Sequence, residues 1–158
     1  YDAWERLGYL TLTNTPIVDQ NFVMQYVLDE CEKYNLDIQC LCFDPANASK
    51  IMMDLSDQGY TVEEVYQSHK SLNESTQGFR EQVFAGNVVY THNPLLNYAM
   101  SNAVIRTSNG LIKIDKDANT KRIDPVDATL AAFKLALYHD FEGENLNDYV
   151  ARFLEENT

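Results

Sequence analysis

Two Asp-Pro steps are the residues of this 158-residue chain whose types and spacing could do chemistry. Asp124-Pro125 opens an apolar stretch, and Asp127 follows one helical turn after Asp124, so both carboxylates can face the same way. Asp44-Pro45 lies upstream, where an apolar run gives way to another expected helix. If the two steps meet in space, they form a cluster of three acids.

Such a cluster would favour divalent cations. Two carboxylates about 4 Å apart repel each other by about 4 kcal/mol at an effective dielectric near 20, unless cations neutralise them. Oxygen ligands suit Mg²⁺ or Mn²⁺. Two such ions close together can activate a water and stabilise the leaving oxygen in phosphodiester hydrolysis. Asp44, Asp124 and Asp127 are therefore candidate metal ligands.

A simpler interpretation of the same residues remains open. Asp followed by Pro is a favoured pair at the start of a helix, so Asp44 and Asp124 could serve only as caps for unpaired amides. Asp127 could be a first-turn acid that interacts with the helix dipole. Spacing alone does not separate these interpretations.

The elements that would position these acids follow from apolar periodicity and turn signals. The pattern predicts helices over residues 1–8, 19–33, 45–58, 74–85 and 95–100, a helix from residue 124 with Leu130, Phe133, Leu135 and Leu137 buried, and a surface helix over 146–155. It predicts strands over residues 9–13, 37–43 and 61–66, and a hairpin of 104–107 with 111–114 around Asn109-Gly110.

The strand over residues 37–43 is apolar almost throughout, which is typical of a strand covered on both faces in a largely parallel sheet. Asp44 stands at its carboxyl end, where open α/β sheets bind their ligands. The sequence therefore predicts an α/β fold with a site at this edge.

Composition limits the possible partners. Twelve basic and twenty-four acidic residues give a net charge of −12, so contact with nucleic acid must rest on local patches or on metal ions. Lys121 and Arg122 could touch a phosphate, although a solvated loop is the simpler interpretation. No apolar run is long enough for a membrane span, and the start does not resemble a signal peptide, so we expect a soluble intracellular protein. We expect its three cysteines to be buried thiols in a reducing compartment.

An ordered set of motifs resembles a known family. The set comprises Tyr1-x-x-Trp4 with Gly8-Tyr9-Leu10-Thr11, then Phe43-Asp44-Pro45-Ala46-Asn47-Ala48, His92-x-Pro94 with Ser101-Asn102-Ala103-Val104, and Lys121-Arg122-Ile123-Asp124-Pro125-Val126-Asp127-Ala128. In this order it resembles the nuclease domain of tailed-phage terminase large subunits, over roughly residues 1 to 138. We accordingly expect a nuclease domain over 1–140 and an acidic tail over 141–158.

The resemblance implies an RNase H-like mixed sheet flanked by helices. It also implies a nuclease that cuts concatemeric viral double-stranded DNA with two Mg²⁺ or Mn²⁺ ions during genome packaging. It implies metal binding by Asp44 and Asp124, with Asp127 as a third ligand found in some relatives. The implied partners are an ATPase domain, a small terminase subunit and a portal, in the host-cell cytoplasm and without a membrane.

One departure from the family pattern limits the expected activity. The family's remaining acid lies on a first strand, upstream of the Tyr-x-x-Trp segment, which this sequence does not contain. We therefore expect a sheet incomplete at its N-terminal side and weak or absent cleavage by this chain alone. Two alternatives are a non-catalytic binding or assembly module of the packaging machinery and, less favoured, a phosphoacceptor domain with Asp44 as the acceptor.

Overall fold

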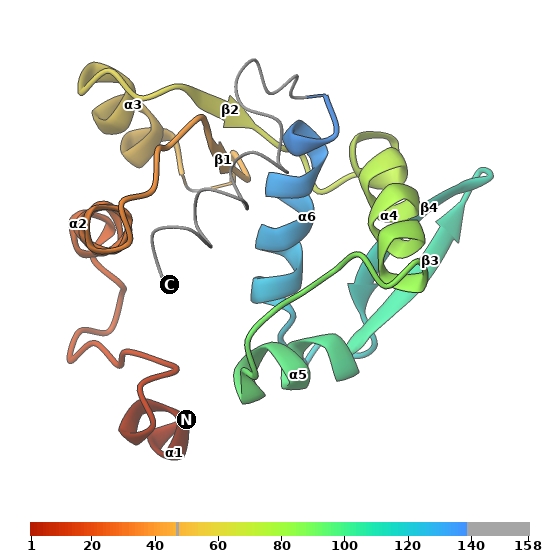
Figure 1. Cartoon of the computed structure of the whole chain (residues 1–158), viewed down its shortest axis with the longest axis horizontal. Coiled ribbons are helices and arrows are strands. Elements are labelled where there is room, and N and C mark those ends of the chain that lie inside the picture. The colour runs from red at the N-terminus through yellow and green to blue at the C-terminus, as the bar shows by residue number, and fades with distance from the viewer. Residues whose placement is uncertain (47, 139–158) are drawn as a thin grey trace, which may run out of the picture.

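A computed structural model describes residues 1–46 and 48–138 of the chain (Figure 1). Its helices are α1 (Asp2–Arg6), α2 (Gln20–Lys33), α3 (Ser49–Asp57), α4 (His69–Phe84), α5 (Pro94–Ser101) and α6 (Asp124–Ala136). Its strands are β1 (Leu41–Phe43), β2 (Val62–Glu64), β3 (Ala103–Ser108) and β4 (Leu111–Lys116).

The strands form two separate ladders in the described part of the chain. β1 and β2 pair in parallel, with α3 as the connection between them. β3 and β4 pair antiparallel as a hairpin, whose turn residues Asn109 and Gly110 have φ values of 50° and 76°. Both positive φ values suit the tight turn that Asn-Gly favours, so the predicted hairpin is confirmed. The mixed α/β class is also confirmed, although parallel and antiparallel strands do not share one sheet here.

β1 is covered on both faces, as its apolar sequence predicts. Leu41 and Phe43 lie against α2 and α3, where they line a small apolar cavity with Ile51. Cys42 points the other way and packs on a buried cluster of Val65, Leu72 and Ala131, which come from the segment after β2, from α4 and from α6. The burial raises the pKa of the Cys42 thiol to about 11.

α6 lies between the two halves of the molecule in Figure 1. On one side it contacts β1, and on the other it contacts α4 and α5. Its buried residues Val126 and Leu130 join Ala99 of α5 and Ile123 in a second core cluster, against which Ile114 of the hairpin packs. The packing of α6 against β1 on one side and against α4 and α5 on the other fixes the direction in which its first turn points.

Side-chain caps explain where several helices begin. Asp19 Oδ1 accepts from the amide of Asn21 before α2, and Ser68 Oγ accepts from the amide of Ser71 before α4. Asn93 Oδ1 accepts from two amides at the start of α5. Polar side chains of this kind satisfy the amides that a helix leaves unpaired at its N-terminus.

Several expected details are wrong. Residues 9–13 form no strand, β1 and β2 are shorter than predicted, and α4 begins at His69 rather than at residue 74. α2 has its predicted amphipathic pattern but no buried residue, and Tyr26 on its apolar face is 51% exposed. Leu137 is 39% exposed where burial was expected, and the three cysteines are only partly buried.

No described helix is long and apolar enough to cross a membrane. The expected tail helix over 146–155 and the predicted boundary between residues 140 and 141 fall outside the described residues.

Candidate functional site

The start of α6 presents two carboxylates that do not act as caps. The N-cap is Ile123, which makes no side-chain capping bond, and Pro125 occupies the first turn. Asp124 is exposed and Asp127 is half-buried one turn further on, with its amide donating to the carbonyl of Ile123 over 3.0 Å. The capping interpretation of Asp124 is therefore wrong, while both acids remain in the first turn, where the helix dipole favours negative charge.

Asp44 directly follows β1 and is exposed. Its Oδ1 accepts from the amide of Ala46 over 3.1 Å, a local turn contact. The expected helix from residue 45 begins only at Ser49, with Ala48 as its N-cap, so the capping interpretation of Asp44 is wrong. One oxygen of the carboxylate makes this bond, and the side chain stays open to solvent. Asp44 thus has a structural contact and remains accessible to a ligand.

The pKa of Asp127 depends on its burial and on the charges around it. Partial burial raises the pKa of Asp127 to about 6, and the negative charge of Asp124 adds to the rise. The ammonium group of Lys113 opposes the rise, whereas Asp115 and Asp44 increase it. Acids from the end of β1, from β4 and from the start of α6 therefore all contribute to the electrostatic environment of Asp127.

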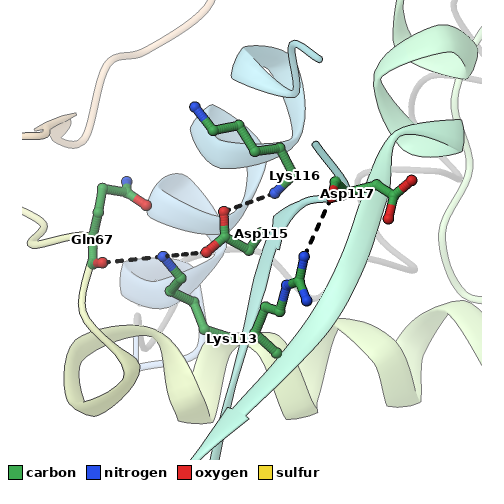
Figure 2. A network of polar contacts seen from close by, with 6 residues as sticks. Gln67, Lys113, Asp115, Lys116 and Asp117 are labelled. Atoms are coloured by element: carbon green, nitrogen blue, oxygen red, sulfur yellow. Dashed lines mark hydrogen bonds and ion pairs between the residues drawn. The ribbon is translucent and has the colours of Figure 1, made fainter. Parts of the chain in front are cut away.

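Asp115 is the acid that the sequence did not reveal. Its Oδ2 lies 3.2 Å from Nζ of Lys113, and its Oδ1 accepts from the amide of Lys116 over 2.8 Å (Figure 2). Partial burial alone would raise the pKa of Asp115, but these two donors outweigh it and hold the pKa below its ordinary value. The carboxylate is therefore ionised and held in place on β4.

Lys113 stands between the hairpin and the segment that follows β2. Besides its ion pair with Asp115, its Nζ donates to the carbonyl of Gln67 over 3.4 Å, as Figure 2 shows. The side chain is largely buried, with 15% of its surface exposed. One cation in the middle of several acids offsets part of their mutual repulsion.

The donor chemistry of these acids fits a hard divalent cation. Carboxylate oxygens are the ligands that Mg²⁺ and Mn²⁺ prefer. Burial and then repulsion by Asp124 raise the pKa of Asp127, and a bound cation would lower it. However, no three acidic, histidine or cysteine side chains in the described part of the chain stand close enough together to hold a metal ion. The acids influence one another electrostatically, but in the described residues their carboxylates do not stand close enough together to bind one metal ion.

Basic side chains near the acids lie on the hairpin and the loop after it. Arg106 donates from Nη2 to the carbonyl of Asp117 over 3.3 Å, and Arg122 is exposed immediately before the start of α6. Lys121 is half-buried in the same loop. This region could contact a phosphate close to the carboxylates.

Comparisons with known proteins agree with one another. A family model described as "Terminase large subunit, endonuclease domain" matches residues 1–140. A solved structure, the large terminase of bacteriophage HK97, is 25% identical to this chain and superposes with a TM-score of 0.74. The match covers 85% of this chain and 28% of that chain, so this chain spans little more than a quarter of the length of the HK97 protein. None of the curated proteins compared matches it.

Proposed function

The chain belongs to the family of terminase large subunit endonuclease domains, and we propose that it is the metal-dependent nuclease part of a phage DNA-packaging enzyme. Its proposed substrate is concatemeric double-stranded viral DNA, cut by phosphodiester hydrolysis. The observation that carries the proposal is that, in a chain of this family, the charges of Asp124 in the same turn and of Asp44 from a distant part of the sequence both raise the pKa of Asp127.

The proposed ligands are Asp44, Asp124 and Asp127. Two Mg²⁺ or Mn²⁺ ions bound there would supply an activated water and stabilise the departing oxygen. Asp44 and Asp124 are exposed, so their side chains can turn toward a cation without moving the backbone. Asp127 is half-buried and its position is set by α6, so it would serve as the fixed ligand around which the others gather.

Basic residues of the chain would support the proposed site without binding metal. Lys113 keeps Asp115 ionised and lowers the pKa of Asp127, so that more of the Asp127 carboxylate is charged at neutral pH than burial alone would allow. Arg122 and Lys121 lie next to Asp124 in sequence and would contact the phosphate backbone of the DNA. The family's further acid, on a strand that this sequence does not contain, would complete the set.

The proposed setting follows from the family. The other partners would be an ATPase domain of the same large subunit, a small terminase subunit and a portal. The place of action would be the cytoplasm of the host cell. Because the family's further acid is not in this sequence, we expect weak or absent cleavage by residues 1–158 alone.

Plasmid cleavage by the full-length protein tests the proposal. With Mg²⁺ or Mn²⁺ the wild type should cut the plasmid, and Asp44→Asn or Asp124→Asn should lower the rate by at least about a hundredfold, because each removes a charged ligand. Asp57→Asn is the matched control, since Asp57 is an exposed acid at the end of α3. Wild-type rates in both site variants would refute the assignment.

An assembly module without catalysis is the second candidate. The observation in its favour is the exposed apolar face of α2, where Phe22, Val23 and Tyr26 are 43%, 39% and 51% exposed. Such a face commonly marks a contact surface. Loss of assembly with the small subunit or the portal in a Phe22→Ser variant, together with no metal-dependent cleavage by the wild type, would favour this function over the first.

A further inference from the structure

The loop between the hairpin and α6 is held at its first end by the main chain of Asn102. Asn102 is the C-cap of α5, directly precedes β3 and is 5% exposed. The amide of Asp117 donates to its carbonyl over 2.8 Å. This bond extends the β3–β4 ladder beyond its last pair, Ala103 with Lys116, so Asn102 marks the base of the hairpin.

The side chain of the same residue holds the other end of the loop. Nδ2 of Asn102 donates to the carbonyl of Arg122 over 3.4 Å, a contact between residues 20 apart in sequence. Arg122 is followed by Ile123, the N-cap of α6. A single buried side chain thus links the base of the hairpin to the beginning of the helix.

This link matters because the first turn of α6 has no side-chain cap. The amides of Val126 and Asp127 donate to the carbonyl of Ile123 over 2.8 and 3.0 Å, so the orientation of the Ile123 peptide sets the first turn. The Arg122 carbonyl belongs to the preceding peptide plane, which is joined to this one through the φ and ψ of Ile123, so holding it restricts how the chain enters the helix. Unlike the caps of α2 and α4, the contact with Asn102 pairs with no amide of its helix, but it holds the main chain in place just before the N-cap of α6.

We propose that Asn102 is a positioning residue for the carboxylate site. It fixes the spacing between Asp115, two residues before Asp117 on the hairpin, and the α6 acids Asp124 and Asp127. The proposal rests on the proposed nuclease function, because it assigns to Asn102 the spacing of that site's acids. Mutation of residues that orient metal ligands typically costs about 10–100-fold in metal affinity or activity.

Amide hydrogen exchange tests the positioning without metal or substrate. Asn102→Ala removes the side-chain bond and leaves the bond from Asp117 to the main-chain carbonyl. We expect exchange at Val126 and Asp127 to become about tenfold faster, while exchange at Asp117 stays at the wild-type rate. Asn102→Leu, which keeps the side-chain volume, should give the same pattern if Asn102→Ala folds poorly. Unchanged exchange at Val126 and Asp127 would overturn the proposal.

The link to the site needs a second measurement in the full-length protein. The Mn²⁺ concentration for half-maximal plasmid cleavage should rise about tenfold or more in the Asn102 variants. Leu55→Val, in the core between α3 and β1, is a control for lost stability alone and should leave this concentration at the wild-type value.

The outcomes separate the two claims. An active wild type with equal Mn²⁺ dependence in the Asn102 and Leu55 variants would refute the role of Asn102 and leave the nuclease function in place. A wild type that shows no metal-dependent cleavage would refute the nuclease function and, with it, the role of Asn102 in that site.

Discussion

Asp127 lies half-buried in the first turn of α6, where its charge has lost part of its hydration and faces the charge of Asp124. Its pKa of about 6 in the folded protein exceeds the value of about 3.9 of a free Asp, so the folded state binds the proton more tightly than the unfolded state. The stability that this proton contributes is fully present below about pH 4 and is lost as the pH rises through about 6. Metal-free protein at neutral pH therefore carries an unfavourable charge at this position.

Asp127→Asn should remove that cost. At pH 7.5 and without metal, we expect the variant to be more stable than the wild type by about 1 kcal/mol, after allowance for solvent screening of a partly exposed group. The difference should vanish near pH 4, and urea unfolding at the two pH values measures it. Asp57→Asn, an exposed control, should show no such pH dependence. Equal stabilities of wild type and Asp127→Asn at both pH values would contradict the prediction.

Lys113 should set how far the pKa of Asp127 rises. Because its ammonium lowers that pKa, Lys113→Met should move the Asp127 titration to higher pH, as followed by carboxyl carbon chemical shifts. Asp115 should move in the same direction, since it loses its ion pair. Lys116→Met serves as the comparison, because Lys116 contacts Asp115 through its main-chain amide. A titration of Asp127 that is the same in both variants would count against the electrostatic link.

At the scale of the elements, α4 and α6 approach closely at Gly78. A Cβ placed on Gly78 would lie 3.3 Å from Cε1 of Phe133 and 3.4 Å from Cδ2 of Leu137, both in or just after α6. A larger residue would push on the helix whose first turn carries Asp124 and Asp127. The packing of α4 is thus coupled to the placement of the acids.

Gly78→Val should destabilise the protein by about 1–3 kcal/mol, because its two methyl groups overpack this contact. Gln77→Val, at an exposed position of the same helix, introduces the same side chain away from this contact and should lose less than half as much, although helix propensity alone favours Val over Gly and disfavours Val relative to Gln. Urea unfolding of the two variants compares them directly. Equal losses would show that α6 moves aside without cost.

Local signals in the sequence were sufficient for most elements. Asn109-Gly110 predicted the hairpin, and Asp19 predicted the beginning of α2, since each acts through bonds or dihedral angles within a few residues. The start of α4 was missed because its first turn, from His69 to Asn73, is mostly polar. There the cap of Ser68 and the bond from the amide of Ile112 to Asn73 Oδ1 stabilise the helix, and the second of these is a tertiary contact.

The site was predictable only in part for the same reason. Asp44 and Asp124 lie in recognisable Asp-Pro steps, Asp127 follows one turn later, and the charges of the first two both raise the pKa of Asp127. Asp115 sits in an alternating strand, where a charged residue is typical of a solvent-facing position. Asp115 faces the other acids only because the hairpin packs against α4 and α6. The sequence pattern of β4 does not predict that packing.

At the scale of the whole molecule, positive charge is concentrated beside the site. Residues 106–122 contain five basic and two acidic residues, a local charge of +3, which leaves −15 for the rest of a chain whose net charge is −12. A long polyanion would therefore be attracted to the hairpin and the loop after it, and repelled elsewhere. The distribution would restrict the direction from which the proposed DNA substrate approaches.

Salt dependence of DNA binding by the full-length protein should report these contacts. Replacing Lys121 and Arg122 together by Gln should reduce the slope of log K against log salt by about 2, since each lost phosphate contact removes about 0.9. Lys33→Gln, in a surface ion pair on α2, should leave the slope unchanged. An unchanged slope in the double variant would mean that DNA does not contact this loop.

The separation of the strands into two ladders has a consequence for the order of folding. The hairpin closes between neighbouring residues such as Ser108 and Leu111, and contacts of this kind form in microseconds. The parallel pairing of Leu41 with Val62, and the docking of β1 on α6, join distant parts of the chain and form later. Asp115, Asp124 and Asp127 would thus be assembled first, and Asp44 would arrive last. The proposed metal site would therefore be complete only at the end of folding.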